Sequence, residues 1–360
     1  MLRPHLVHIN VRCQWEKVIM GQKIRASIGS LGVLGLRKIE LPAPPTTLYL
    51  MIGEKCMYNC AYCPQARESK GSTEQLSRVV WPKVKWDELK NLLLQKPGYI
   101  KRICFQIVNS PCFLDELVFY INDLKGYFKD NNLNLPISVS VRLTSIDNLQ
   151  QVFDVGAERA GLPLDVASEE NFAELRGGNF RNSVDFILNA SKRFPGKITT
   201  HLIVGLKETD FELYNLMKTF FENGITVALF SFTPVKGTRL EALKPPTLSR
   251  YRRIQFLRYL LSKRANFEPE FDENGTLVAI APSKEEKATG EGFYNFILEV
   301  LRDPAIFMTS GCPNCNRPYY NETPSGPILN YPFVPDKDAL TGIMGTFIDK
   351  VSENEIRFKT

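Results

Sequence analysis

Hydrophobic positions along the middle of the chain follow two alternating periods. Short, nearly continuous apolar runs predict buried strands. Between these runs, apolar residues recur three and four positions apart, which predicts amphipathic helices, several of which end near glycine. The predicted strands are 47–53, 99–108, 136–144, 159–167, 197–206 and 226–235. The predicted helices between them are 85–95, 113–130, 145–156, 181–194 and 211–224.

This alternation predicts the fold class. Strands separated by helices require right-handed crossovers and a parallel sheet. We therefore expect an α/β fold, a partial (β/α)6 to full β/α barrel. The chemistry of such barrels lies on loops at the carboxyl ends of the strands.

Proline and glycine positions divide the chain into three predicted parts. The proline-rich segment 41–47 marks the boundary between an N-terminal arm (1–45) and a barrel core (46–245). Within the arm, the glycines of 25–36 lack a phosphate-loop pattern, which favours a packing loop. The remainder (246–360) should contain helices, a hairpin with its turn at Asn274 and Gly275, and an irregular cysteine-containing tail that covers the barrel.

Composition and charge narrow the compartment and the partners. The chain has 360 residues, of which 44% are hydrophobic and 23% charged, and a mild net charge of +6. Basic and apolar residues share helical spacing at 251–264, which predicts a solvated helix face and no nucleic-acid partner. Residues 1–15 lack a secretory pattern and no run of about 18 apolar residues occurs, so we expect a cytoplasmic protein without a membrane partner. In a reducing compartment, clustered cysteines are typical of metal ligands.

One such cluster directly follows the first predicted strand. Cys56, Cys60 and Cys63 lie within eight residues of each other, and no fourth ligand stands beside them. A structural zinc site closes its tetrahedron with four protein ligands, whereas a [4Fe-4S] cluster held by three thiolates keeps one iron open. The Cys-x3-Cys-x2-Cys spacing, with Tyr62 before the last cysteine, resembles the signature of the radical S-adenosylmethionine (radical SAM) superfamily.

This resemblance implies a cofactor and a chemistry. The open iron of the [4Fe-4S] cluster chelates S-adenosylmethionine, and an electron from a reductant such as ferredoxin cleaves it to a 5′-deoxyadenosyl radical. The segment 203–208 fits the family's Ile-x-Gly-x-x-Glu pattern, which places Ile203 and Gly205 near the adenine; for Gly205 a plain strand end is the alternative. Where members carry Gly-Gly-Glu, this chain has Gln106 and Asn109 as polar substitutes for binding the cofactor.

Two further segments resemble the biotin synthase-like group of this superfamily. Residues 162–172 resemble the segment whose aspartate binds the cofactor ribose, and Asp165 takes that position, with a helix N-cap as the alternative. Residues 232–241 resemble the group's Pro-x-x-Gly-Thr-x-Leu-Glu motif. Arg142 and Arg181 are candidate partners of the cofactor carboxylate, or else members of surface ion pairs.

The tail points to a particular branch of that group. Residues 311–322, with Cys312 and Cys315, resemble the archaeal, two-protein type of lipoyl synthase. That resemblance implies a second, auxiliary iron–sulfur cluster that donates sulfur to an octanoyl chain on a carrier protein or peptide, and a sister radical SAM protein. Biotin synthase itself is disfavoured because only Cys104 matches its second cluster. The candidates for the remaining ligands are Cys104, Cys112, Cys13 and a non-cysteine group.

Other assignments stay open on the sequence. The Cys-x-x-Cys pair also fits a zinc knuckle or a redox pair, and the chain also fits a radical SAM synthase or mutase without sulfur insertion, or an electron-transfer module. Leu229, Phe230 and Phe232 either line a substrate channel or belong to the core. His201 is expected to be a core residue rather than a catalyst.

Overall fold

The computed structural model describes residues 22–96, 98–283, 292–322, 326–352 and 355–359. Within these residues the main sheet has eight strands in the order β10-β9-β8-β7-β6-β2-β1-β5. All neighbours from β10 to β2 are parallel. Their bounds are β2 (Thr47–Ile52), β6 (Arg102–Ile107), β7 (Ile137–Ser140), β8 (Arg159–Gly161), β9 (Ile198–Val204) and β10 (Thr226–Ser231). The sheet order does not close on itself, and the predicted α/β partial barrel is confirmed.

Helices follow the parallel strands as the periodicity predicts. The five predicted helices correspond to α2 (Trp86–Gln95), α3 (Phe113–Asp130), α4 (Ile146–Asp154), α6 (Phe180–Arg193) and α7 (Asp210–Glu222), and the short helix α5 (Glu169–Leu175) was not predicted. Polar N-cap side chains begin several of them. At α7, Thr209 and Glu212 form a capping box, in which each side chain binds the backbone N–H of the other. Caps of this kind fix where each loop ends.

The glycine-containing stretch 25–36 is more regular than predicted. It contributes to β1 (Lys23–Ala26), which pairs antiparallel with β2 and with β5 (Lys83–Lys85), and to α1 (Ile28–Val33). The packing-loop prediction was therefore wrong. Ser27 ends the strand and caps the helix, because its side chain accepts a hydrogen bond from the Ser30 backbone N–H.

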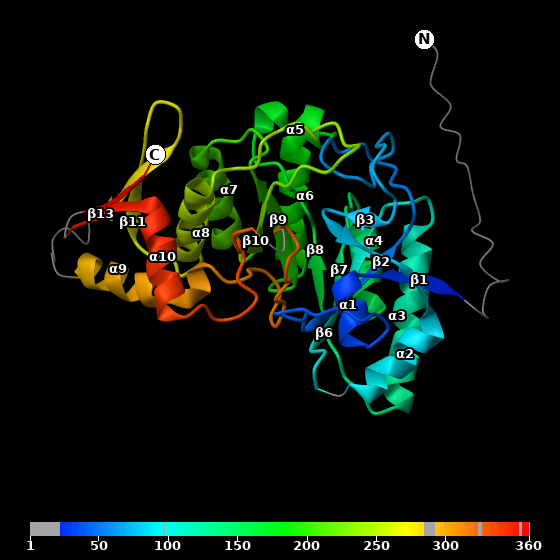
Figure 1. The fold of residues 1–360 in the computed structure, drawn as a ribbon. Helices are drawn as coiled ribbons and strands as arrows, with labels where there is room; N and C mark the ends of the chain where they lie inside the picture. Colours follow the sequence, from blue (N-terminus) through cyan, green and yellow to red (C-terminus); the bar gives the residue numbers. More distant parts are fainter. Residues whose placement is uncertain (1–21, 97, 284–291, 323–325, 353–354, 360) are drawn as a thin grey trace, which may run out of the picture.

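A second sheet lies beside the barrel (Figure 1). Its order is β11-β12-β14-β13, and the predicted hairpin is confirmed, with Gly275 at a positive φ of 73° in its turn. The elements of this region are α8 (Leu248–Ser262), β11 (Phe267–Phe271), β12 (Leu277–Pro282), α9 (Gly292–Arg302), α10 (Lys337–Phe347), β13 (Ile348–Val351) and β14 (Ile356–Phe358). The tail is thus less irregular than expected, because α10 and two strands follow the cysteine pair.

Helix α8 is buried rather than solvated, which corrects the prediction for 251–264. The guanidinium of Arg253 lies 3.0 Å from the Asp210 carboxylate, and that of Arg250 lies 2.8 Å from it. Arg252 is also buried and donates to the backbone carbonyl of Leu329 at 2.6 Å. Buried arginines need such partners. All of these partners are distant in sequence, so helical spacing alone gave no indication of them.

Residues 309–322, here called the strap, cross the open side of the barrel (Figure 1, orange). At one end, the Leu229 N–H on the edge strand β10 donates to the Ser310 hydroxyl at 3.0 Å. Further along, the Asn316 side chain accepts from the Thr46 N–H at 3.0 Å, directly before β2. The strap therefore connects β10 to β2, and it carries Cys312 and Cys315 into the barrel.

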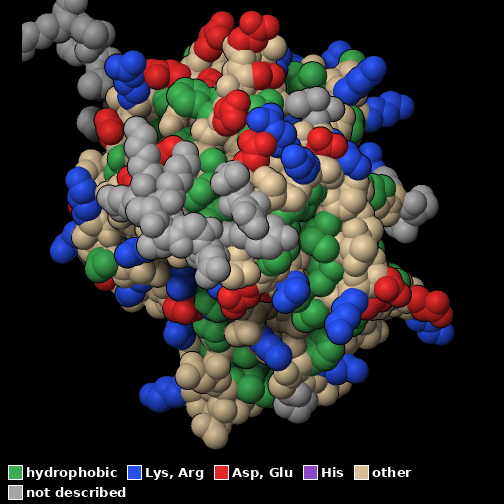
Figure 2. Space-filling model, turned by 90° about the vertical axis from the view of Figure 1, so that its left-hand side faces the viewer, with side chains coloured by type: hydrophobic (Ala, Val, Ile, Leu, Met, Phe, Trp, Pro, Cys, Tyr) green, Lys and Arg blue, Asp and Glu red, His purple; other side chains and the backbone are tan. Residues whose placement is uncertain are grey.

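The outer surface carries both signs of charge. On the face shown in Figure 2, Lys and Arg side chains are interspersed with Asp and Glu, without a single basic patch. None of the described helices combines the length and hydrophobicity that crossing a lipid bilayer requires.

Candidate functional site

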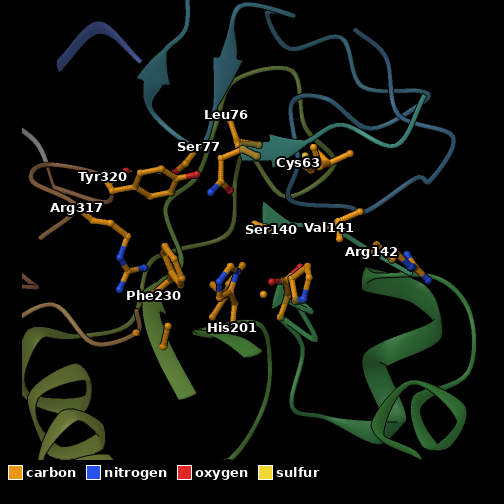
Figure 3. A pocket seen from close by; sticks show the side chains of 18 of the residues that line it. Cys63, Leu76, Ser77, Ser140, Val141, Arg142, His201, Phe230, Arg317 and Tyr320 are labelled. Carbon is orange, nitrogen blue, oxygen red and sulfur yellow. Dashed lines mark hydrogen bonds between the residues drawn. The ribbon is translucent and has the colours of Figure 1, made fainter. Parts of the chain in front are cut away.

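A central cavity of about 240 Å³ lies inside the partial barrel. The described residues place six cysteines on its walls: Cys56, Cys60, Cys63, Cys104, Cys312 and Cys315. Figure 3 shows Cys63 and Arg142 on one side of the cavity and Arg317, Phe230 and Tyr320 on the other. Both cysteine groups singled out in the sequence therefore face the same space.

The three-cysteine loop leaves the carboxyl end of β2 through a glycine that has no substitute. Gly53 has a φ of 82°, and a Cβ atom there would lie 2.1 Å from the carbonyl oxygen of Val108. Backbone hydrogen bonds then hold the loop: Cys56 N–H donates to Gln65, and Met57 N–H donates to Asn109. The positions of the three thiols are thus set by local backbone structure.

The chemistry of this loop fits a cluster. Burial raises the pKa of Cys56 and of Cys63, so metal binding must displace their protons. Within the described part of the chain, no three His, Cys, Asp or Glu side chains converge closely enough to ligate a single metal ion. A cubane cluster takes each thiolate on a different iron, so its ligands stand further apart than those of one ion.

Behind the loop, Tyr62, Asp165 and Arg176 form a buried polar group. The Tyr62 hydroxyl donates to the Asp165 carboxylate at 2.7 Å, and the Arg176 Nε lies 3.9 Å from the same oxygen. Asp165 has a φ of 64°, a left-handed conformation that aspartate adopts more readily than most residues. Burial opposes the charge on Arg176, but Tyr62 and Asp165 outweigh it and raise the pKa of the guanidinium.

Arg176 also connects this group to the cysteine loop. Its Nη1 lies 3.8 Å from the Cys60 sulfur, and its buried Nε has no hydrogen-bond partner within the described structure. An unpartnered buried donor beside the cavity is available to an anionic or polar ligand. Arg142, whose guanidinium lies 3.8 Å from the Tyr58 ring centroid, donates to the carbonyls of Arg176 and Gly177 and so holds this corner together.

The other predicted cofactor residues lie in different places. Ile203, Gln106 and Asn109 line the cavity. Gln106 Nε2 lies 3.0 Å from the Cys104 sulfur, and the Asn109 side chain donates to the Arg142 carbonyl, so both amides have protein partners. Gln106 thus faces the second cysteine group rather than the first.

Gly205 and Arg181 are not among the lining residues. Gly205 has a φ of 102° and packs against Pro246, which a Cβ atom would approach to 2.7 Å, so its need for glycine is structural. The Glu208 carboxylate accepts from the backbone N–H groups of Gly205 and Leu206, which explains the Ile-x-Gly-x-x-Glu spacing as a turn. Arg181 lies on the surface and pairs with Glu169 at 2.6 Å, because α6 directs it outward.

The second cysteine group is assembled across three strands and the strap. Tyr49, Cys104 and Ser138 are register partners on adjacent strands β2, β6 and β7, so they form one row on the inner face. The strap meets this row at both ends. The Tyr49 hydroxyl lies 3.2 Å from the Cys315 sulfur, and the Ser138 hydroxyl donates to the Cys312 sulfur at 3.6 Å.

Arg102 anchors the cysteine turn of the strap to the barrel. Its Nε donates to the Pro313 carbonyl at 3.0 Å, and its Nη1 donates to Ser138 at 2.6 Å. The same guanidinium pairs with Glu158 at 2.6 Å. Burial raises the pKa of Cys104 and of Cys312, so a ligand role again requires proton displacement by a metal.

The two remaining cysteines of the chain are Cys112 and Cys13. Cys112 precedes α3, is disulfide-bonded and is absent from the described lining residues. Cys13, the other candidate for the second cluster, lies outside the described residues.

Aromatic residues and a histidine complete the cavity wall. Phe230 and Phe232 line the cavity, whereas Leu229 belongs to the core. His201 also lines the cavity, contrary to its assignment as a core residue, and burial lowers its pKa to about 4. It is therefore neutral near pH 7 and serves as a polar, uncharged wall.

Several residues of the site could not be predicted from sequence patterns. Arg176 follows α5 in the motif Arg-Gly-Gly, and only the return of that loop to Cys60 reveals its place. Tyr49 and Ser138 are ordinary strand residues until the parallel register aligns them with Cys104. Strand alternation assigns a residue to one face of a sheet, but it does not pair strands with each other.

Comparison with known proteins identifies the superfamily of the barrel region. Residues 50–220 match the Radical SAM superfamily. The lipoyl synthase of Buchnera aphidicola subsp. Schizaphis graminum (strain Sg) is 23% identical over 201 residues, which cover 51% of this chain and 55% of that protein. The chain thus spans about half the length of this curated relative.

Solved structures with a similar fold are distant in sequence. Methylornithine synthase (PylB) is 17% identical with a TM-score of 0.48 over 60% of this chain and 62% of that chain. HydG, a maturase of the [FeFe]-hydrogenase, is 14% identical with a TM-score of 0.49, over 61% and 50%. SuiB of Streptococcus suis bound to S-adenosylmethionine is 15% identical with a TM-score of 0.43, over 62% and 49%.

The superfamily match and the three-cysteine loop both indicate a [4Fe-4S] cluster that binds S-adenosylmethionine. Members of the superfamily bind a [4Fe-4S] cluster and S-adenosylmethionine, and Cys56, Cys60 and Cys63 lie within the matched residues. Residues 50–220 therefore form a Radical SAM superfamily domain.

Proposed function

We propose that this enzyme inserts sulfur at unactivated C–H positions of a protein-bound octanoyl chain, as one subunit of a two-protein lipoyl synthase. One observation carries the proposal. Cys104, Cys312 and Cys315 line the same cavity as the three-cysteine loop. Sulfur insertion needs a radical generator and a sulfur source that reach the same carbon, and one cavity with two cysteine groups provides for both.

In this proposal each cluster has its own set of ligands. Cys56, Cys60 and Cys63 hold the first cluster, and Asp165, which Tyr62 orients at 2.7 Å, binds the cofactor ribose. When bound, the first cluster with S-adenosylmethionine supplies a radical that removes one hydrogen atom from each attacked carbon, and the second cluster supplies sulfide.

Cys104, Cys312 and Cys315 are three ligands for the second cluster. The hydroxyls of Tyr49 and Ser138 stand beside these sulfurs and are the candidates for the non-cysteine ligand. Arg102 positions the turn by binding both Ser138 and Pro313. A turn held by a buried guanidinium keeps Cys312 and Cys315 at a fixed depth in the barrel.

The wall between the two groups suits an alkyl substrate. Ile203, Phe230 and Phe232 present apolar surface to the cavity, and His201 stays neutral because burial lowers its pKa to about 4. Apolar walls exclude water from a reactive radical and favour burial of a hydrocarbon chain. Charged groups stand on both sides of this wall: Asp165 and Arg176 lie close to each other on one side, and on the other the Arg317 guanidinium lies 4.0 Å from the Phe230 ring centroid.

The proposed partners follow from this chemistry. The octanoyl chain is carried by a lipoyl carrier protein or a peptide, a reductant such as ferredoxin supplies electrons, and a sister radical SAM protein shares the two sulfur insertions. The 23% identity to a lipoyl synthase over about half of that protein supports the substrate class.

The first test is the product. The reconstituted, reduced enzyme is incubated with S-adenosylmethionine and an octanoyl-lysine peptide, and the peptide is analysed by mass spectrometry with iron and sulfide determination. We expect thiolated peptide and about eight irons per chain, the content of two cubane clusters. About four irons and an unthiolated peptide would instead favour a radical SAM synthase or mutase without sulfur insertion.

Variants of the strap separate the two groups. We expect Cys312→Ala and Cys315→Ala to cleave S-adenosylmethionine but to form no thiolated product. Asn314→Gly is the matched control, because Asn314 has a φ of 63° that glycine adopts freely and it supplies no thiol. If both cysteine variants still thiolate the peptide, the sulfur-donor role of the strap is wrong.

A further inference from the structure

A second cavity, of about 520 Å³, opens beside the central one. Its volume lies within the range of about 300–1,000 Å³ that is usual for ligand sites. Its walls come from the start of α1, the hairpin of β3 (Gln75–Leu76) and β4 (Val79–Val80), the loop after β10, and the strap. It therefore lies where the strap closes the open side of the barrel.

Three side chains line both cavities: Tyr49, Arg317 and Tyr320. Tyr49 is the residue whose hydroxyl lies 3.2 Å from the Cys315 sulfur. The Arg317 guanidinium lies 4.0 Å from the ring centroid of Phe230, and the Tyr320 ring centroid lies 5.5 Å from it. Figure 3 shows Arg317, Phe230 and Tyr320 together on the wall opposite Cys63. A chain that passes this wall reaches the space between the two cysteine groups.

The interior of the second cavity is mainly apolar. Its apolar lining includes Ile28, Leu41, Pro45, Val79, Trp81 and Val235. Trp81 is fully buried, and its indole N–H has no hydrogen-bond partner among the described residues. A buried donor without a partner is costly unless a ligand supplies an acceptor, such as an amide carbonyl.

The exposed charged side chains that line this cavity are basic. Arg78 and Lys236 are exposed, and neither forms an ion pair with an acidic residue in the described part of the chain. Glu322 is acidic, but its carboxylate accepts the backbone N–H groups of Asn321, Leu329 and Asn330. The free charge at this cavity is therefore positive.

We propose that the second cavity receives the acylated lysine arm of an acidic polypeptide. The acyl chain passes the wall of Tyr49, Arg317 and Tyr320 into the central cavity. The amide carbonyl of the arm meets the Trp81 indole, and acidic side chains beside the modified lysine pair with Arg78 and Lys236. This inference rests on the proposed function and adds the route and the recognition of its substrate.

A carrier-bound chain fits the arrangement better than a free fatty acid does. Arg78 and Lys236 are exposed, whereas the wall toward the central cavity consists of two tyrosines and Arg317, whose guanidinium packs on the Phe230 ring and donates to the Ser310 carbonyl. A free octanoate would place its carboxylate within the apolar interior, where burial of an unpaired charge is costly. An amide is uncharged there and leaves the cations to the flanking residues of the polypeptide.

The test is a binding measurement on the reconstituted full-length enzyme. Fluorescein-labelled octanoyl-lysine peptides with glutamate or with lysine neighbours are titrated by anisotropy, without reductant. In Arg78→Glu/Lys236→Glu we expect affinity for the glutamate-flanked peptide to fall about 10-fold and the preference between peptides to reverse. The control Lys129→Glu/Lys192→Glu changes the same charge on α3 and α6 and should bind like the unmodified enzyme.

The outcomes separate the two proposals. If the unmodified enzyme binds neither octanoyl peptide, the proposed substrate class is wrong. If it binds both peptides and charge reversal at Arg78 and Lys236 changes neither affinity, the second cavity is not the recognition site. Competition by free octanoate that depends on the same two cations would also overturn the carrier-bound assignment.

Discussion

The two cysteine groups of this enzyme are built in opposite ways. Cys56, Cys60 and Cys63 stand on one loop, and hydrogen bonds of its own backbone fix their positions. Cys104, Cys312 and Cys315 come together from a strand and a strap that are more than 200 positions apart in the sequence. The first group is therefore a local structure, whereas the second exists only when the barrel and the strap are both folded.

The largest expected effect tests the local group. Cys60→Ala should abolish cleavage of S-adenosylmethionine and lower the iron content by about four, because a cubane cluster needs its three thiolates. The measurements are 5′-deoxyadenosine formation and iron analysis, with Cys312→Ala as the comparison. If Cys60→Ala still cleaved S-adenosylmethionine, the first cysteine group would not be the one that holds the cofactor-binding cluster.

The next effect tests the second cysteine group through Arg102, which anchors the strap to the barrel. Arg102→Met leaves Glu158 without its buried-side partner and releases the Pro313 carbonyl. We expect the free energy of unfolding to fall by about 3 kcal/mol, because two charge-assisted hydrogen bonds, to the Pro313 carbonyl and to Ser138, are lost; the ion pair adds little, since the Glu158 side chain is 46% exposed. Urea unfolding measures this, and Mössbauer spectra should show the second cluster lost and the first retained. The exposed neighbour Lys101→Met is the control; an unchanged second cluster in Arg102→Met would contradict the anchoring role.

A third effect concerns the pH dependence of stability. It comes from His201, which lines the cavity that both cysteine groups face. Its pKa is lowered to about 4 in the folded protein, against about 6.5 in an unfolded chain. The unfolded state therefore binds more protons between these values, so stability is present above about pH 6.5 and is lost as the pH falls toward 4, by at most about 3 kcal/mol. Urea unfolding of the metal-free protein at several pH values checks this. His201→Gln should flatten the dependence; an equally steep profile in that variant would assign it to other groups.

Local patterns were sufficient to predict much of this molecule. The six parallel strands (β2 and β6 to β10) and the hairpin turn at Gly275 follow from periodicity and turn residues. The three-cysteine loop was also visible, because all its ligands lie within eight residues. In each case, the residues that decide the structure are neighbours in sequence.

The failures share the opposite property. Helix α8 was predicted to be solvated because Asp210, the partner of Arg250 and Arg253, lies some forty positions away. Of the two alternatives for Arg181, the surface ion pair is the one observed, and the arginine at the cavity is Arg176, since the direction of each side chain depends on how α5 and α6 pack. The row of Tyr49, Cys104 and Ser138 could not be predicted, because it depends on the register between the strands.

The strap also has a consequence for the order of folding. It joins Thr46 to Asn316, residues separated by 270 positions, and contacts of such separation form slowly because a long loop must close first. During synthesis the barrel strands emerge before the strap does. We therefore expect a stage in maturation at which the barrel is still laterally open. At this stage the first cysteine group can already be formed, whereas the second group does not yet exist.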